Sequence, residues 1–149
     1  MSNTRRQLLV AGLIGLGAGI RVRAAEGTTG ELAATLRAYT GNTTPRAGRV
    51  KLEMDLLVEN GNAVPVTVNV DSPMTPADHV KTIALFNERN PQREIAVFTL
   101  SPRSGRARVA TRIRLATSQK LVAIAQMSDG SYWSHTVEVI VTLAGCVET

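Results

Sequence analysis

The sequence predicts an all-β fold: an immunoglobulin-like β-sandwich with a short N-terminal helix and a flexible C-terminal arm. Apolar and polar residues alternate with a period of two through most of the chain after Gly41, as in strands that bury one face. Turn sequences rich in Gly, Pro, Asn, Asp and Ser separate about seven such segments, a spacing typical of sandwich domains. The chain has one cysteine, so packing alone must hold the two sheets together.

The first 24 residues have the layout of a removable signal peptide. They contain no acid, and Arg5 and Arg6 precede an apolar stretch over residues 8–20 that is too short to span a bilayer comfortably. The paired arginines, with apolar residues two and three places later, match a twin-arginine signal; an ordinary secretory signal is the alternative. We therefore expect cleavage before Ala25 and export to the periplasm. No cysteine follows the cut, so no membrane anchor is expected after cleavage.

Export changes the charge of the chain. The formal net charge of +5 comes from 17 basic and 12 acidic residues. Removing the signal with its four arginines leaves 13 basic residues against 12 acidic ones, a net charge of +1. A chain this close to neutral lacks the basic surface that nucleic-acid binding needs, so no nucleic-acid partner is expected.

The mature chain is predicted to form one sandwich domain over residues 25–142. Thr28 and Glu31 have the spacing of a capping box, and Leu32, Leu36 and Tyr39 share one helical face, which predicts a helix from about residue 28 to about residue 41. Alternation predicts strands at 51–56, 64–71, 108–115 and 137–143. Continuous apolar runs at 80–86, 95–100 and 121–127 predict strands that are more deeply buried.

The sequence predicts no metal site, no cofactor and no enzyme active site. His79 and His135 are far apart and lack the spacing of metal ligands, so we expect them to face solvent or to be hydrogen-bonded. Ser104 and Ser131 lie in turn sequences, and no GxSxG elbow or glycine-rich phosphate loop is present.

The densest charge cluster consists of Arg103, Arg106, Arg108, Arg112 and Arg114. From Arg108 on, the arginines alternate with apolar residues, so several would share one sheet face. That face is either simply solvated or docks an acidic partner or an oxoanion, for which the planar guanidinium is suited. Trp133, just before the last predicted strand, is expected to anchor the core or an interface.

Cys146 lies fourth from the C-terminus, on a predicted arm over residues 143–149. In an exported chain, an unpaired cysteine either bonds to another molecule or remains a reactive group. Gly145 gives the backbone freedom beside it, and a thiolate can hold sulfur reversibly without a metal. No cation adjoins Cys146 in sequence, and Glu148 disfavours ionisation. The residues alone leave two alternatives: an inert terminal thiol, or a nucleophile or covalent carrier.

Seven runs of residues, in order along nearly the whole chain, add a family resemblance. They are AYTG (38–41), ENGNAVPV (59–66), VDSPM (70–74), NERNP (87–91), SPRSGRA (101–107), TRIRLA (111–116) and MSDGSYW (127–133). With them the chain resembles SoxY, the sulfur-carrier subunit of periplasmic thiosulfate oxidation. The resemblance implies a sandwich fold, a heterodimer with a SoxZ-like subunit, and covalent sulfur attachment at Cys146. It also implies that a cytochrome, a sulfate-releasing hydrolase and a sulfur dehydrogenase act on the carried sulfur.

The tip of the arm departs from the family pattern. Family members end in Gly-Gly-Cys-Gly-Gly or close to it, whereas here Ala144, Gly145, Cys146, Val147 and Glu148 occupy these places. β-branched Val147 stiffens the tip, and Glu148 adds a negative charge near an anionic cargo. The departure keeps two alternatives open: a divergent paralogue with a regulatory, storage or other sulfur-relay role, and a binding module that carries no sulfur.

Overall fold

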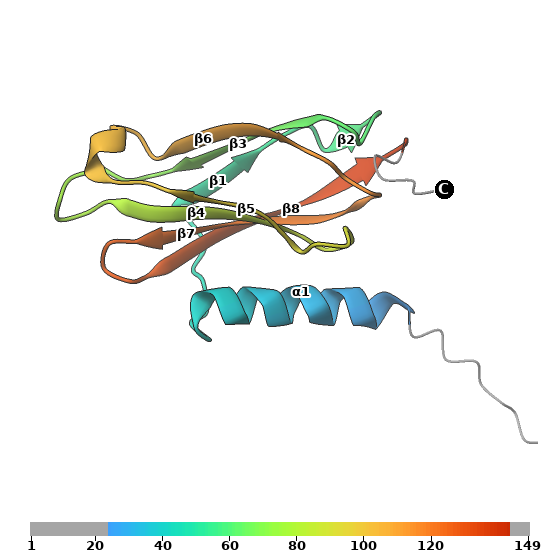
Figure 1. Ribbon diagram of the computed structural model, residues 1–149, viewed down its shortest axis with the longest axis horizontal. Coiled ribbons are helices and arrows are strands. Elements are labelled where there is room, and N and C mark those ends of the chain that lie inside the picture. Colours follow the sequence, from blue (N-terminus) through green and yellow to red (C-terminus); the bar gives the residue numbers. More distant parts are fainter. Residues whose placement is uncertain (1–23, 144–149) are drawn as a thin grey trace, which may run out of the picture.

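Three layers build the fold: helix α1 packs on a five-stranded sheet, and a three-stranded sheet covers the other face of that sheet (Figure 1). The computed structural model describes residues 24–143. The elements are α1 (Ala24–Thr40), β1 (Val50–Glu53), β2 (Leu57–Val58), β3 (Val64–Val70), β4 (Val80–Asn87), β5 (Glu94–Thr99), η1 (Pro102–Ser104), β6 (Arg108–Ile113), β7 (Gln119–Met127) and β8 (Tyr132–Val141). This architecture confirms the predicted fold class. Within residues 24–143, no helix has the length and hydropathy required to cross a membrane.

The two sheets are antiparallel apart from one short pair. Their strand orders are β1-β3-β6 and β2-β8-β7-β4-β5. β2 pairs with β8 in parallel, with Leu57 opposite Ile140 and Val58 opposite Val141. β2 is therefore a two-residue edge strand beside the end of β8, the end from which the chain leaves the domain (Figure 1).

The main core lies between the sheets. From β3, Val64, Val66, Val68 and Val70 are buried while the residues between them are more exposed, as the alternation predicted. Strands β4 and β7 are buried on both faces because α1 covers the outer one, which explains their continuous apolar sequences. Burial of a valine or a larger aliphatic side chain contributes about 1.5–3 kcal/mol relative to exposure.

Helix α1 begins four residues earlier than predicted. The capping-box spacing predicted a start near Thr28, whereas the helix begins at Ala24 and ends before Gly41. Gly41 has a φ of 60°, the left-handed conformation that commonly ends helices. Glu31 is wrong as a capping residue because it lies within the helix, where its carboxylate pairs with Arg93.

The predicted apolar face of α1 is confirmed. Leu32 is buried, and Leu36 and Tyr39 pack beside it on a cluster that includes Phe86. The rings of Tyr39 and Phe86 meet edge to face, with centroids 5.2 Å apart. The Tyr39 hydroxyl lies 2.8 Å from Thr82 Oγ1, and burial raises the pKa of this tyrosine.

Three strand predictions were wrong in detail. The strand predicted at 51–56 ends at Glu53, where the chain leaves the three-stranded sheet, and Leu56 is exposed. The run at 95–100 forms β5, an edge strand on which Val97 is exposed, rather than a deeply buried strand. The last strand begins at Tyr132, so Trp133 lies within it rather than before it.

Candidate functional site

The predicted arm residues Ala144, Gly145 and Cys146 lie outside the described residues, so the described part of the site is the chain that leads to them. β8 ends at Val141, and Thr142 and Leu143 follow it. We call residues 141–143 the arm base.

One edge of the arm base is fixed by β2 and the residue after it. The Thr142 N–H donates to the Val58 carbonyl at 2.9 Å. The Thr142 hydroxyl donates to the Glu59 carbonyl at 3.3 Å. These bonds extend the parallel pairing beyond the end of β8.

Gly61 links the arm base to the three-stranded sheet. Its N–H donates to the Leu143 carbonyl at 2.9 Å, and its carbonyl accepts from the Leu115 N–H at 2.8 Å. The turn around it is shaped by Asn62, whose N–H donates to Asn60 Oδ1 at 2.9 Å. The run ENGNAVPV therefore includes a turn that holds the last described residue in place.

Ser118 fixes the opposite edge. The Val141 N–H donates to Ser118 Oγ at 2.8 Å, and the same hydroxyl donates to the Val141 carbonyl at 3.4 Å. The hydroxyl takes the place of a neighbouring strand, since β7 begins only at Gln119. The chain is thus held on both edges at Val141, and on one edge up to Leu143, three residues before Cys146. No sequence pattern pointed to Ser118, whereas Gly61 lies in one of the family runs.

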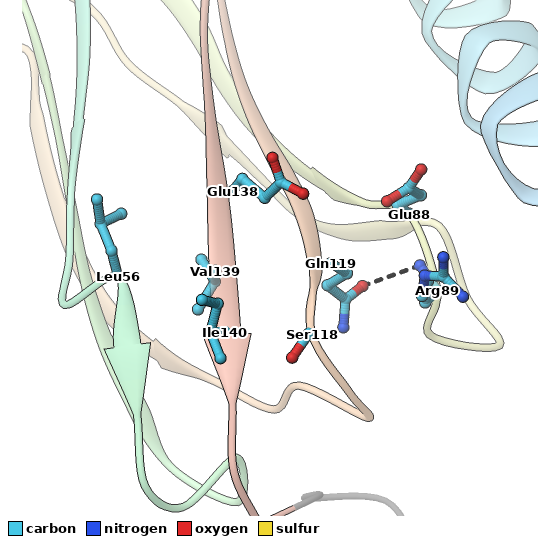
Figure 2. A pocket seen from close by; sticks show the side chains of 8 residues that line it. All are labelled: Leu56, Glu88, Arg89, Ser118, Gln119, Glu138, Val139 and Ile140. Atoms are coloured by element: carbon cyan, nitrogen blue, oxygen red, sulfur yellow. Dashed lines mark hydrogen bonds between the residues drawn. The ribbon is translucent and has the colours of Figure 1, made fainter.

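A cavity of about 540 Å³ opens beside the arm base (Figure 2). It is lined by Leu56, Glu88, Arg89, Ser118, Gln119, Glu138, Val139 and Ile140. Figure 2 shows Leu56 and Ile140 on one side of this cavity, and Glu88 and Arg89 across from them.

Glu88 lines this cavity, and its side chain is buried. Its Oε2 accepts from the Lys120 N–H at 3.2 Å, and its Oε1 accepts from the Thr29 hydroxyl at 2.9 Å. Burial alone would raise the pKa of Glu88, but these hydrogen bonds and the charges of Lys120 and Arg89 outweigh it and lower the pKa. Glu88 therefore stays ionised and joins α1 to the sheet.

Two further residues of the NERNP run, Arg89 and Asn90, form a polar network with Gln119 beside the cavity. Asn90 Oδ1 accepts from the Ala116 N–H at 3.0 Å and from Gln119 Nε2 at 2.8 Å. The Arg89 N–H donates to Gln119 Oε1 at 2.9 Å (Figure 2). These side chains hold one another and the backbone, which is a structural role.

The predicted arginine cluster is divided along β6. Arg108 and Arg112 are both exposed on one face of this strand, as expected. Arg103 lies on η1 and Arg106 follows it, whereas Arg114 lies past the other end of β6, next to Leu115 and hence near the arm base. Since β6 alone spans roughly 20 Å, the five arginines do not converge on one site.

Trp133 is a core anchor at the far end of β8. Its ring packs on the core, and the guanidinium carbons of Arg46 and Arg49 lie 5.8 and 5.4 Å from the ring centroid. Its indole N–H donates to Ser131 Oγ at 3.2 Å. The backbone approaches the ring at Gly48, where an added Cβ would lie 3.5 Å from it. The cation–π pairs were not predicted, because residues 46 and 49 carry no signal that would relate them to Trp133.

The histidines are hydrogen-bonded. The His79 Nδ1–H donates to the Thr75 carbonyl at 3.1 Å, and His135 Nδ1 accepts from the Leu52 N–H at 3.0 Å. Among residues 24–143, no three His, Cys, Asp or Glu side chains gather as metal ligands do.

Comparisons with known proteins agree with this architecture. The SoxY solved from Chlorobium limicola f thiosulfatophilum, a sulfur carrier protein, is 25% identical and superposes with a TM-score of 0.64, over 76% of this chain and 93% of that chain. Superoxide reductase (neelaredoxin) from Ignicoccus hospitalis is 22% identical, with a TM-score of 0.56 over 63% and 80% of the two chains. Superoxide reductase from Nanoarchaeum equitans is 16% identical, with a TM-score of 0.55 over 64% and 100%. The two reductases share the fold alone.

No curated protein matches the chain. The family of the sulfur oxidation protein SoxY matches residues 36–146, most of the chain. This match begins at Leu36, near the C-terminal end of α1, runs through both sheets and the arm base, and ends at Cys146 itself. The chain therefore belongs to the SoxY family of sulfur oxidation proteins.

Proposed function

We propose that the chain is a covalent sulfur carrier in sulfur oxidation and that Cys146 is the attachment point. The observation that carries the proposal is the family match, which extends to Cys146, the only thiol of the chain. The related Chlorobium limicola protein is a sulfur carrier, and most of this chain superposes on it.

From this chain, the chemistry requires only a thiolate. Its sulfur joins the outer sulfur of thiosulfate in a new S–S bond, and the two electrons released pass to a cytochrome of the pathway. The product is a Cys146 S-thiosulfonate with one negative charge. A hydrolase then adds water across the terminal S–S bond, which releases sulfate and leaves a persulfide on the cysteine. In this scheme the chain bears the substrate and the partner enzymes perform the catalysis.

The arm base supports this role by setting the reach of the thiol. Hydrogen bonds hold the chain up to Leu143, and three residues lead from there to Cys146. An extended chain spans at most about 3.6 Å per residue, so the Cys146 Cα lies within about 11 Å of the Leu143 Cα. The carrier therefore presents its cargo close to a fixed point of the sandwich.

The partner subunit, the cellular compartment and the enzymes of this proposed role are those that SoxY family membership implies. The working unit is a heterodimer with a SoxZ-like subunit, located in the periplasm after twin-arginine export. A cytochrome, a sulfate-releasing hydrolase and a sulfur dehydrogenase act on its arm in turn.

A reconstituted pathway tests the function. Purified mature chain, its SoxZ-like subunit and the pathway enzymes should release sulfate from thiosulfate. Cys146→Ser, which keeps the size of the side chain, should abolish that flux while leaving the heterodimer intact. Undiminished flux with the serine variant would contradict the proposal.

The altered tip favours a second function, that of a divergent paralogue with another sulfur-relay partner. Val147 and Glu148 replace glycines next to the cysteine, and bulk and charge there hinder entry into a tunnel fitted to glycine. Restoring Gly-Gly-Cys-Gly-Gly, with Thr149 removed, would raise turnover by standard pathway enzymes at least about tenfold if this second function is right. Full turnover with the native tip rejects the second function.

A further inference from the structure

Four large apolar side chains are exposed around the arm base. They are Leu56, Leu57, Ile140 and Leu143, with exposed fractions of 55, 63, 57 and 62%. Leu57 and Ile140 are direct partners across the β2–β8 pair, so they form one continuous ridge. Leu56 and Ile140 also form the apolar wall of the 540 Å³ cavity (Figure 2). Apolar residues gathered on a short edge strand commonly mark an interaction surface.

One flank of this ridge is acidic. A second hollow, of about 340 Å³, lies beside it and is lined by Asp55, Leu57, Val58, Glu59, Asn60, Ala63, Val64 and Pro65. Asp55 and Glu59 are exposed on either side of Leu57, and no basic residue is among those that line this hollow. On the other flank, Glu138 faces Lys120 across β7 and β8, so the charges there are mixed. We call Leu56, Leu57, Ile140, Leu143, Asp55 and Glu59 the collar.

Because the arm is short, any enzyme that receives the cargo must dock close to the collar. Three residues lead from Leu143 to Cys146, and a chain of that length reaches at most about 11 Å. An enzyme whose active site receives the cargo on Cys146 therefore has its entrance against the surface around Leu143. The collar is the apolar and acidic surface at that place.

The charge of the cargo determines which entrance fits. A thiosulfonate is an anion, and a site that binds it must supply cations or oriented donors. Cations around the mouth of that site would meet the acidic flank of the collar at Asp55 and Glu59, whereas an acidic mouth would be repelled.

We propose that the collar is the docking surface for the enzymes that act on loaded Cys146, and that it fits an apolar active-site entrance bordered by basic residues. This inference rests on the proposed function and adds the surface of this chain that its enzymes recognise. The ridge supplies affinity through apolar burial, and the acidic flank steers the encounter.

The test begins by loading the carrier without any enzyme. The Cys146 thiolate attacks an inner sulfur of tetrathionate, the central S–S bond breaks, and the S-thiosulfonate forms as thiosulfate leaves. Tetrathionate is itself the oxidant of the thiol in this exchange, so no cytochrome is needed. Wild type and all variants, each as the heterodimer, are loaded to the same extent by this exchange. Sulfate release by the pathway's hydrolase is then measured against carrier concentration.

Two double variants probe the two parts of the collar. Leu57→Ser with Ile140→Ser should lower kcat/KM about tenfold with kcat unchanged, because only docking is weakened. Asp55→Asn with Glu59→Gln should lower kcat/KM about threefold at low salt and have little effect at about 0.5 M salt. The matched control is Val97→Ser, an exposed apolar residue on β5 at the opposite edge of the five-stranded sheet, which should behave as wild type.

The outcomes separate the two proposals. If loaded wild type is not consumed by the hydrolase, the carrier function fails and the docking surface fails with it. If wild type is consumed and both collar variants equal the Val97→Ser control, only the docking surface is overturned. Loss of the SoxZ-like subunit from the serine double variant, seen by size-exclusion chromatography, would assign the ridge to the permanent subunit and also overturn the proposal.

Discussion

Glu88 joins helix α1 to the five-stranded sheet beside the candidate functional site. It is buried, yet its carboxylate accepts hydrogen bonds from the Thr29 hydroxyl of α1 and from the Lys120 N–H of β7. Its pKa is lowered, so ionised Glu88 is favoured in the folded state relative to the unfolded chain.

Protonation of Glu88 should therefore destabilise the domain. The contribution of this carboxylate is fully present above the unfolded pKa of about 4.3 and is lost as pH falls through the lower folded pKa. Glu88→Gln should be less stable than wild type by roughly 1–2 kcal/mol at pH 7, because an amide is a weaker acceptor than a carboxylate. It should also lose less stability as pH falls below about 4.3.

Urea unfolding at several pH values, followed by the fluorescence of Trp133, measures both effects. Glu138→Gln, at an exposed position on β8, is the control and should leave stability nearly unchanged. Equal stability and equal pH dependence of wild type and Glu88→Gln would show that this carboxylate does not join α1 to the sheet.

Single residues were predicted from sequence with uneven success. Trp133 was expected to anchor either the core or an interface, and its ring packs on the core, as is common for a large aromatic residue. Several arginines were expected to share one sheet face, and Arg108 and Arg112 do so; alternation fixes which face a residue takes but not how far apart the ends of a strand lie. No sequence pattern predicts the role of Ser118, because its partner, Val141, is distant in sequence.

Among the elements, β8 matters most for the proposed function, because its C-terminal end leads into the arm base. Ser118 holds its last residue on one edge, while Val58, Glu59 and Gly61 hold Thr142 and Leu143 on the other. A frayed strand end would let the arm begin earlier in the chain. Under the proposed function, the arm base therefore determines where the arm begins.

Ser118→Ala should loosen this strand end. The substitution removes both hydrogen bonds to Val141 and should lower stability by about 1 kcal/mol. Amide hydrogen exchange at Val141 and Thr142 should speed up, because the arm base then opens without global unfolding. Ser104→Ala, on η1, is the control that leaves exchange at these amides unchanged. Unaltered exchange in Ser118→Ala would mean that the other edge alone fixes the arm base.

Strands were predicted well where apolar and polar residues alternate over a long segment and one face of the strand is buried. β3 fits the pattern because four valines point into the core. The prediction for 51–56 failed because apolar residues continue past Glu53, and a pattern cannot show where a chain crosses to another sheet. The prediction for 95–100 failed because a continuous apolar run does not reveal that a strand lies at an edge.

At the scale of the whole molecule, the sandwich has two different ends. The arm base, the collar and the 540 Å³ cavity lie at the end of β8 near its C-terminus. Trp133 and its two arginines lie at the start of β8, roughly 30 Å away along the strand. Family membership and fold were predictable from sequence, whereas this division depends on how distant segments meet in space.

Export is the prediction that concerns the intact precursor. Arg5→Lys with Arg6→Lys keeps the charge but removes the paired arginines, so the unprocessed chain should accumulate in the cytoplasm and the periplasmic form should be lost. Immunoblots of fractionated cells measure this, with Arg21→Lys and Arg23→Lys as controls that should still be exported. Normal export of the paired lysine variant would indicate an ordinary secretory signal.

Intact-mass analysis of the purified mature heterodimer tests the central claim most directly. After incubation with thiosulfate, the cytochrome and an electron acceptor, the chain should gain the mass of one S₂O₃ group, and reduction should remove it. Cys146→Ser should gain nothing under the same conditions. An unmodified wild-type mass, or the same gain on Cys146→Ser, would contradict the claim that this chain carries sulfur on Cys146.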